Sequence, residues 1–386
     1  MKAQSVYIHI PFCQQICHYC DFTKFFYNEK LATEYIEALS NEINTQIDGT
    51  KNQVNTIFIG GGTPTALNLE QLRSLMQLID AKFDVAGASE FSIEANPGDF
   101  DEEKAKLLKS FGVNRVSLGV QVFDDAMLEE LGRLHKIKDV YSTVALLQQN
   151  GFDNVSLDMI YALPNQTVEH FRQTLDEALS FNLPHYSAYA LQIEPKTVFY
   201  QRYHKGKLHR PPQEEEVRMY DILKESMKNN GLQQYEISNF AKPGYESLHN
   251  LVYWKNEHYY GFGAGAHGYL PGKRTGNIRP LPAYIKQALE NGYPVLNTEE
   301  ISMKEMIEEE MFLGLRKMEG ISNQQFIEKF GIPYELLYKD AISYLKDKGW
   351  VMTDGEYLRL TDQGILFGNE VFAQFLLEED DLSVVR

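Results

Sequence analysis

Residues 5–22 read Ser-Val-Tyr-Ile-His-Ile-Pro-Phe-Cys-Gln-Gln-Ile-Cys-His-Tyr-Cys-Asp-Phe and contain every cysteine of the chain: Cys13, Cys17 and Cys20. The β-branched and aromatic residues before Cys13 predict a strand that leads into a cysteine loop. Three neighbouring thiols cannot all pair as disulfides, but as thiolates they can hold one metal centre. An iron–sulfur cluster normally takes four thiolates, so three leave one iron open to an outside ligand. We therefore expect this loop to be the functional centre of the protein.

A structural zinc site is the alternative use of these cysteines, with His9 or His18 as a fourth ligand. Zinc sites usually bring a second Cys-x-x-Cys pair or a spaced pair of histidines, and neither occurs near these cysteines. The composition of the loop therefore favours a cluster.

The bulk composition limits the classes of protein to consider. With 386 residues, of which 43% are hydrophobic, the chain is long enough for two or three packed domains. No apolar run approaches the roughly 18 residues of a membrane-spanning helix, and the residues before the first strand are too few for a signal peptide. Together with the reduced thiols this predicts a cytoplasmic protein. A formal net charge of −17 argues against nucleic acid and anionic lipid as partners.

Between residues 6 and 190, short β-branched runs alternate with longer stretches of helical period, which predicts consecutive βα units and a parallel sheet. The expected strands are Val6–Ile10, Thr56–Ile59, Glu90–Glu94, Arg115–Val120, Asn154–Tyr161 and Tyr186–Gln192. The expected helices are Leu31–Gln46, Leu69–Phe83, Asp101–Phe111, Asp139–Asn150 and Val168–Phe181. Six units instead of eight predict an α/β fold with an open, partial (βα)6 barrel, which we assign to residues 1–195.

Polar residues recur near the ends of these strands. The second strand leads into Gly60–Thr65, a glycine run that suits a close backbone approach or simply a turn. Glu94, Gln121 and Asp158 stand among apolar strand residues, so we expect them to line a polar ligand site, with hydrogen bonds to nearby loops as the alternative. Arg133 can bind a carboxylate bidentately or lie on the surface.

Several motifs together resemble, in order and near spacing, one subgroup of the radical S-adenosylmethionine (SAM) superfamily. The motifs are Cys-x-x-x-Cys-x-x-Cys, Tyr-Ile-His-Ile-Pro-Phe-Cys, Gly-Gly-Gly-Thr-Pro-Thr, Ser-Ile-Glu-Ala-Asn-Pro, Ser-Leu-Gly-Val-Gln, Gly-Arg-Leu-His and Asp-Met-Ile-Tyr-Ala-Leu-Pro-Asn-Gln-Thr. The subgroup comprises oxygen-independent coproporphyrinogen III dehydrogenases and the related heme chaperones of the HemW type. The resemblance implies a [4Fe-4S] cluster on Cys13, Cys17 and Cys20, with SAM on the fourth iron. It implies SAM contacts from Tyr7, Tyr19, Gly61, Gly62, Thr63, Glu94, Gln121, Arg133 and Asp158.

Two departures separate the relatives within this subgroup. The dehydrogenase type carries a fourth cysteine where this chain has Phe22, and a longer segment before the first strand. Both differences favour the heme chaperone type, which implies heme as a ligand and heme-accepting apo-proteins, such as those of the respiratory chain, as partners. An oxidoreductase acting on coproporphyrinogen III or another tetrapyrrole is the alternative, and whether the chain is an enzyme stays open.

Residues 196–300 are expected to extend the barrel. They contain His249-Asn-Leu-Val-Tyr-Trp254, which resembles the HNxxYW signature of HemW proteins and implies His249 as a heme ligand. The alternative is a hydrogen-bonded His249, with Tyr253 and Trp254 filling a join between domains. The basic run Arg202–Arg210 either attracts the heme propionates or is a solvated loop. The glycine-rich stretch Tyr259–Tyr269 suits close packing over a ligand or against the barrel.

Residues 301–386 are expected to form a helical, winged-helix-like domain. The expected elements are helices at Lys304–Arg316, Asn323–Phe330 and Pro333–Lys348, strands at Trp350–Thr353 and Tyr357–Thr361 around the Asp354-Gly355 turn, and a helix to about Leu377. The acidic runs Glu308–Glu310 and Glu378–Asp381 argue against nucleic acid. A docking surface for the heme acceptor and a lid over the barrel are both open.

Overall fold

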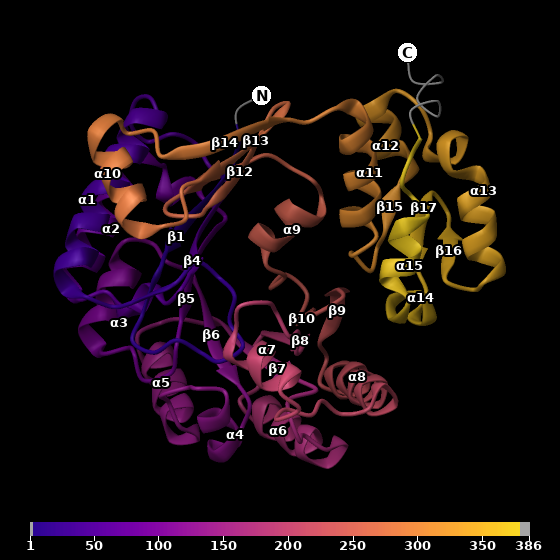
Figure 1. Ribbon diagram of the computed structural model, residues 1–386, viewed down its shortest axis with the longest axis horizontal. Helices are drawn as coiled ribbons and strands as arrows, with labels where there is room; N and C mark the ends of the chain where they lie inside the picture. Colours follow the sequence, from indigo (N-terminus) through magenta and orange to yellow (C-terminus); the bar gives the residue numbers. More distant parts are fainter. Residues whose placement is uncertain (1–2, 379–386) are drawn as a thin grey trace. The chain divides into compact units, whose positions relative to one another are not determined.

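A computed structural model describes residues 3–378, which divide into two compact units (Figure 1). The first unit runs to Gln233 and includes Phe240–His249 and His258–Glu299. The second unit is built from Gln234–Asn239, Asn250–Glu257 and the chain from Glu300 onward. None of the helices within residues 3–378 combines the length and apolar character that crossing a membrane requires.

Six parallel strands form the centre of the sheet in the first unit and lie side by side in chain order. They are β1 (Ser5–Ile10), β4 (Thr56–Gly61), β5 (Glu90–Ala95), β6 (Arg115–Gln121), β7 (Asn154–Tyr161) and β8 (His185–Ala190). Val6, Ile8 and Ile10 of β1 are fully buried, as expected for a parallel strand that is covered by helices. The predicted α/β fold with an open, partial barrel is confirmed.

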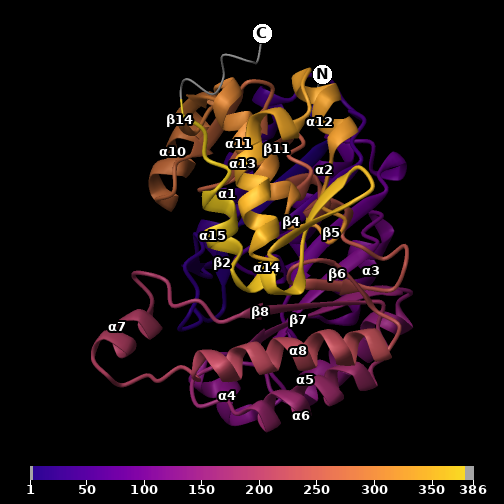
Figure 2. The same ribbon diagram turned by 90° about the vertical axis from the view of Figure 1, so that its right-hand side faces the viewer.

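Helices follow most of these strands and cover one face of the sheet (Figures 1 and 2). They are α1 (Glu29–Gln46), α2 (Leu69–Lys82), α3 (Glu102–Ser110), α4 (Asp125–Glu130), α5 (Ile137–Gln149) and α6 (Val168–Ser180). Helix α1 begins two residues earlier than predicted because the Asn28 side chain caps it by accepting from the Leu31 N–H. The sequence reading missed α4, whose six residues are too few for a helical period to show.

Later segments of the first unit extend the same sheet beyond β1. Strand β11 (Tyr259–Phe262) pairs in parallel with β1, and β12 (His267–Leu270) and β13 (Lys273–Asn277) continue antiparallel. At Gly261 a Cβ atom would lie 1.9 Å from the His267 carbonyl oxygen, so the glycine-rich stretch serves tight packing of this hairpin. The remaining elements before Ile301, of which β9 and α9 lie mostly in the second unit, are α7 (Val198–His204), α8 (Gln213–Asn229), β9 (Gln233–Glu236), β10 (Asn239–Ala241), α9 (Leu248–Trp254), α10 (Leu281–Asn291) and β14 (Val295–Glu300).

The second unit has the predicted order of helices followed by a hairpin. Its elements are α11 (Met303–Gly314), β15 (Ile321–Ser322), α12 (Asn323–Phe330), α13 (Tyr334–Asp347), β16 (Val351–Asp354), β17 (Tyr357–Leu360), α14 (Asp362–Leu366) and α15 (Gly368–Ala373). Strands β15, β17 and β16 form a small sheet in that order, and Met311, Phe326 and Leu358 lie fully buried in the core. The single last helix was a wrong prediction, since the backbone leaves the helical conformation at Phe367.

The acidic run Glu308–Glu310 is not a solvated face. Glu308 accepts from the Leu377 N–H, and Glu310 forms an ion pair with Lys329 at 2.8 Å. Burial raises the pKa of Glu310, and the Lys329 charge opposes that rise. The acidic tail from Glu379 on lies outside the described residues.

Candidate functional site

The cysteine loop follows β1 and is closed at its base by a short pair of parallel strands, β2 (Phe12–Cys13) and β3 (Phe25–Phe26). The Phe25 N–H donates to the Pro11 carbonyl at 2.6 Å, and the Tyr27 N–H donates to the Cys13 carbonyl at 2.9 Å. These hydrogen bonds join the start of the loop to its end, and they hold it next to the carboxyl end of β1.

All three cysteines are free thiols in this loop, Cys13 buried and Cys17 and Cys20 half-buried. Burial raises the pKa of Cys13 to about 11, the Thr63 hydroxyl lowers it, and the neighbouring Cys17 and Cys20 raise it. Burial also raises the pKa of Cys20. Cys13 and Cys20 are therefore protonated at neutral pH, and metal binding by these two thiols must release their protons.

The histidines of the zinc alternative are engaged elsewhere. His9 hydrogen-bonds to the Tyr7 hydroxyl through Nδ1 at 2.9 Å and to the Thr23 carbonyl through Nε2 at 2.7 Å. His18 uses Nδ1 on the Glu130 carbonyl at 2.7 Å. Within residues 3–378, no three Cys, His, Asp or Glu side chains gather closely enough for a single metal ion. A four-iron cluster binds each thiolate to a different iron, so its ligands need not converge on one point, and the donor set fits a cluster better than zinc.

The glycine run after β4 packs on the backbone of the cysteine loop. The Gly62 N–H donates to the Ile10 carbonyl at 2.9 Å, and the Thr63 N–H donates to the Phe12 carbonyl at 2.7 Å. A Cβ atom on Gly62 would lie 2.9 Å from backbone atoms of this loop. The Thr63 hydroxyl also donates to the Cys13 Sγ at 3.6 Å, just before the short helix η1 (Pro64–Ala66). The close approach that the sequence predicted is therefore to the cysteine loop, and contact of Gly61, Gly62 and Thr63 with SAM stays a prediction.

Two carboxylic acids lie on β5 and β7, the strands on either side of β6. Glu94 of β5 accepts from the Gly61 N–H at 2.8 Å. Burial raises the pKa of Glu94 to about 7, the Gly61 N–H lowers it, and Asp158 raises it. Asp158 of β7 accepts from the Ser117 and Ser156 hydroxyls at 2.7 and 3.1 Å, and burial raises its pKa. The two acids are close enough to influence each other, and Asp158 has hydroxyl donors that the sequence reading missed.

The raised pKa of Glu94 predicts a pH-dependent stability. The folded-state pKa of about 7 exceeds the ordinary value of 4.5, so folding favours the protonated acid and the free energy of unfolding falls as pH rises from about 4.5 through 7. Glu94→Gln keeps an acceptor for Gly61 but cannot ionise. Between pH 5 and 8, the free energy of unfolding of the variant should rise by about 2 kcal/mol relative to that of the SAM-free wild type. Urea unfolding measures this difference. The exposed Glu225→Gln serves as the control, and identical pH profiles for E94Q and wild type would contradict the expectation.

Arg133 joins the cysteine loop to the strand ends. Its Nη1 donates to the Cys17 Sγ at 3.4 Å, and its Nη2 donates to the Asn96 Oδ1 at 2.5 Å and to the Gly119 carbonyl. Asn96, which the sequence reading did not single out, also donates to the Thr63 hydroxyl at 2.9 Å. Arg133 is therefore part of the cysteine site and not a surface arginine.

Gln121, Tyr19 and Tyr7 complete the predicted set. Gln121 ends β6 with a φ of +69°, at a register shift between β6 and β7. Tyr19 lies in the cysteine loop with its ring 6.4 Å from that of Phe199 in α7. Tyr7 stacks on Phe58 of β4 at 6.2 Å. All three lie on or next to the strands that carry the other predicted residues, and their contacts with SAM stay predictions.

His249 lies at the opposite ends of the strands. Its Nδ1 hydrogen-bonds at 2.8 Å to the hydroxyl of Thr56, the first residue of β4. Its backbone N–H donates at 3.2 Å to the side chain of Glu90, the first residue of β5. Its ring stacks on Phe58 at 5.1 Å. The side chain is fully buried, and burial lowers its pKa to about 3. Because the side chain is fully buried, His249 could ligate heme iron only after its ring became accessible.

Replacing His249 by alanine should therefore destabilise the fold. The variant loses the ring packing and leaves the Thr56 hydroxyl without this partner, so we expect the free energy of unfolding to drop by about 2–3 kcal/mol. The exposed His170→Ala on α6 is the matched control. Thermal unfolding followed by circular dichroism measures the change. A stable H249A protein with a shifted heme spectrum would instead support His249 as an iron ligand.

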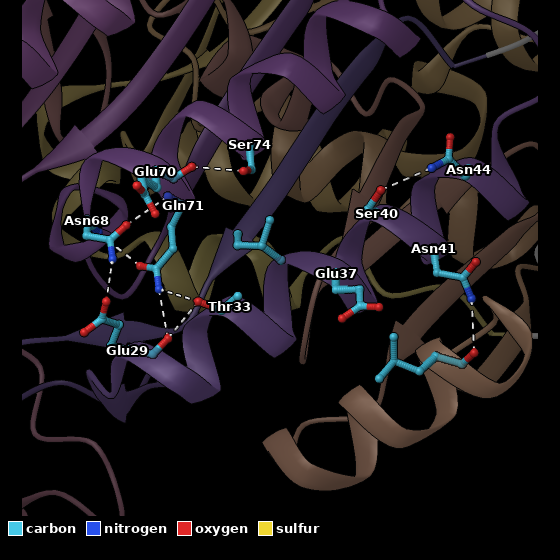
Figure 3. A pocket seen from close by; sticks show the side chains of 12 residues that line it. Glu29, Thr33, Glu37, Ser40, Asn41, Asn44, Asn68, Glu70, Gln71 and Ser74 are labelled. Atoms are coloured by element: carbon cyan, nitrogen blue, oxygen red, sulfur yellow. Dashed lines mark hydrogen bonds between the residues drawn. The ribbon is translucent and has the colours of Figure 1, made fainter.

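A groove of about 690 Å³ lies on the outer surface, lined by residues of α1, α2 and α10 (Figure 3). Its polar groups connect these helices: Gln71 donates to the Glu29 carbonyl at 2.9 Å and to the Thr33 hydroxyl at 3.0 Å, and Asn41 donates to the Ala288 carbonyl at 2.6 Å. None of the predicted site residues lines it. The groove is therefore separate from the cysteine site.

Comparisons with known proteins agree with this geometry. The family model of the radical SAM superfamily matches residues 7–178, and that of the HemN C-terminal domain matches residues 301–367. The chain is 50% identical to the heme chaperone HemW of Bacillus subtilis, over 97% of this chain and 100% of the relative. It is 31% identical to the heme chaperone HemW of Escherichia coli, over 97% of this chain and 98% of the relative. The solved coproporphyrinogen III oxidase (HemN) of Escherichia coli shares the fold with a TM-score of 0.84, at 23% identity, covering 97% of this chain and 90% of that one.

Proposed function

Because the chain belongs to the HemW family of heme chaperones, within the radical SAM superfamily, we propose that it binds heme and transfers it to heme-accepting apo-proteins. The observation that carries this proposal is the 50% identity to a named heme chaperone over nearly the whole chain. In keeping with it, the position after Cys20-Asp21 holds Phe22, an exposed side chain that offers no further thiolate.

The family implies a [4Fe-4S] cluster and SAM, and the cysteine site fits both. Cys13, Cys17 and Cys20 would hold the cluster, which when bound supplies an electron and an iron with a free position for the amino and carboxylate groups of SAM. Thr63 and Arg133 hold Cys13 and Cys17 in place through their hydrogen bonds to sulfur. Glu94 and Asp158 would then accept hydrogen bonds from the hydroxyl groups of the SAM ribose.

The unpaired cysteines bear on the cellular compartment in which the protein acts. Three unpaired cysteines that serve as metal ligands need a reducing compartment, so we place the protein in the cytoplasm. The acceptors that we propose are apo-cytochromes and other heme proteins of the respiratory chain.

Heme titration and transfer test the proposed function. The protein is reconstituted anaerobically, loaded with one equivalent of heme and mixed with an apo-cytochrome, and transfer is followed by the spectrum of the holo-cytochrome. Reduced protein is separately incubated with SAM and coproporphyrinogen III. Heme transfer without formation of protoporphyrinogen supports the chaperone. Protoporphyrinogen formation would favour the tetrapyrrole enzyme, and a protein that does neither would overturn both.

A further inference from the structure

A basic segment stands out in the sequence of this acidic chain. No acidic residue occurs between Pro195 and Gln213, whereas the same segment contains Lys196, Arg202, His204, Lys205, Lys207, His209 and Arg210. Arg210 is neutralised by Glu216 at 2.6 Å. Lys205 and Lys207 are exposed and form no ion pair with any residue that the structure describes. We call residues 196–210 the α7 arm, a segment that concentrates positive charge within a chain of net charge −17.

The α7 arm is attached to the cysteine loop. The Phe199 N–H of α7 donates to the His18 carbonyl at 3.0 Å, and the Phe199 ring lies 6.2 Å from that of His18 and 6.4 Å from that of Tyr19. Leu208, at the other end of the arm, is buried in the same apolar cluster as Phe199. Both ends of the arm are thus anchored beside the loop that carries Cys17 and Cys20, and α7 projects from the unit in Figure 2.

The exposed side of the α7 arm combines apolar, cationic and imidazole groups. Tyr203 is 49% exposed and Val198 is 40% exposed. His204 is exposed, with its ring 4.2 Å from that of Tyr200 and 5.7 Å from that of Tyr203. Heme is a flat apolar macrocycle with two carboxylates at one edge and an iron that accepts an axial imidazole. Aromatic and aliphatic contacts, ammonium groups and a histidine are the three kinds of group that such a ligand needs.

We propose that the α7 arm is the heme-docking site of this protein, with His204 as the axial iron ligand and with Lys205 and Lys207 binding the propionates. This inference rests on the proposed heme-chaperone function and adds the place where heme binds. His204 can reach iron without disturbing the barrel, whereas His249 is fully buried. Heme docked here lies next to the cysteine loop, since Phe199 of the arm contacts His18 and Tyr19.

Variants of the α7 arm test the proposal in the anaerobically reconstituted protein. Lys205→Glu with Lys207→Glu reverses the charge of the arm, and Lys30→Glu with Lys286→Glu makes the same change on α1 and α10, where both lysines are exposed. His204→Ala removes the ligand, with His170→Ala as control. Heme binding is followed by difference absorbance against heme-free protein, and the association rate is measured by stopped flow at two ionic strengths.

Reversing the charge of the α7 arm should slow heme association at least about tenfold at low salt, and this effect should shrink at higher salt because the charges are screened. Reversing the two lysines on α1 and α10 should leave the association rate within about twofold of the wild-type rate. H204A should shift the Soret band and weaken binding about tenfold or more. Wild-type protein that binds heme normally, together with arm variants that behave like it, would overturn the proposal but leave the chaperone function intact. An unchanged Soret band in H204A would remove His204 as the ligand. Wild-type protein that binds no heme would overturn the proposed function itself.

Discussion

Replacing Cys17 by serine should leave the anaerobically reconstituted protein without its iron–sulfur chromophore while the fold is retained. The chain has only three cysteines, all in one loop, so no other thiol can take the place of a lost ligand. The half-buried Cys17 side chain accepts a hydrogen bond from Arg133. A serine oxygen can accept the same hydrogen bond, so the free energy of unfolding should change little. We expect iron to fall from about four atoms per chain to less than about one, with loss of the brown colour and of SAM binding.

Gln14→Ser is the matched control for this variant, because Gln14 is exposed in the same loop and is not a predicted ligand. Iron and sulfide analysis with the absorbance spectrum of both variants measures the effect. A C17S protein that keeps a full complement of iron would mean that the cluster is not held by this loop. The control should retain the wild-type spectrum.

Gly61→Ala should strongly destabilise the first unit. Gly61 has a φ of +114°, which an L residue adopts only with strain, and a Cβ atom there would lie 2.3 Å from the His9 ring. The ring cannot move freely, because both of its nitrogens are hydrogen-bonded and Gly263 packs against the His9 backbone. We expect the free energy of unfolding to fall by more than about 3 kcal/mol.

Gly231→Ala is the control that separates the clash with His9 from the strain of a positive φ angle. Gly231 has a φ of +73° and has no atom within 4 Å of its would-be Cβ, so this variant should lose only about 1 kcal/mol. Urea and thermal unfolding measure both variants. Since His9 holds the Thr23 carbonyl, G61A should also load less cluster than wild type, whereas G231A should load normally. Equal stability losses in the two variants would contradict the role of the His9 contact.

The elements that the sequence predicted well are those with a local signal. The six central strands are β-branched runs buried under helices, and such runs are visible in any short window of the sequence. The start of α1 was displaced because the Asn28 cap lies outside the periodic pattern. The break at Phe367 was missed although Gly368 follows it directly. Local pattern therefore gave the strands and most helices, but not their ends.

The contacts that the sequence could not show join residues far apart in the chain. Strand β11 pairs with β1 across some 250 residues, for instance Tyr7 with Gly261. The sequences of the two strands carry no signal that predicts this pairing. Asn96 meets Arg133 and Thr63 only because three loops converge at one edge of the sheet. The burial of His249 could not be predicted from its motif, because its partners Thr56 and Glu90 belong to strands 193 and 159 residues earlier. Burial of this kind has no signature in the motif itself.

The position of β1 between β4 and β11 has a consequence for biogenesis. On the ribosome the three cysteines emerge long before β11, so β1 remains an unprotected edge strand until Tyr259–Phe262 has been translated. The sheet around the cysteine loop is therefore complete only after Tyr259–Phe262 has been made. We expect iron and sulfide to be inserted after that point, which makes cofactor maturation a late event in synthesis.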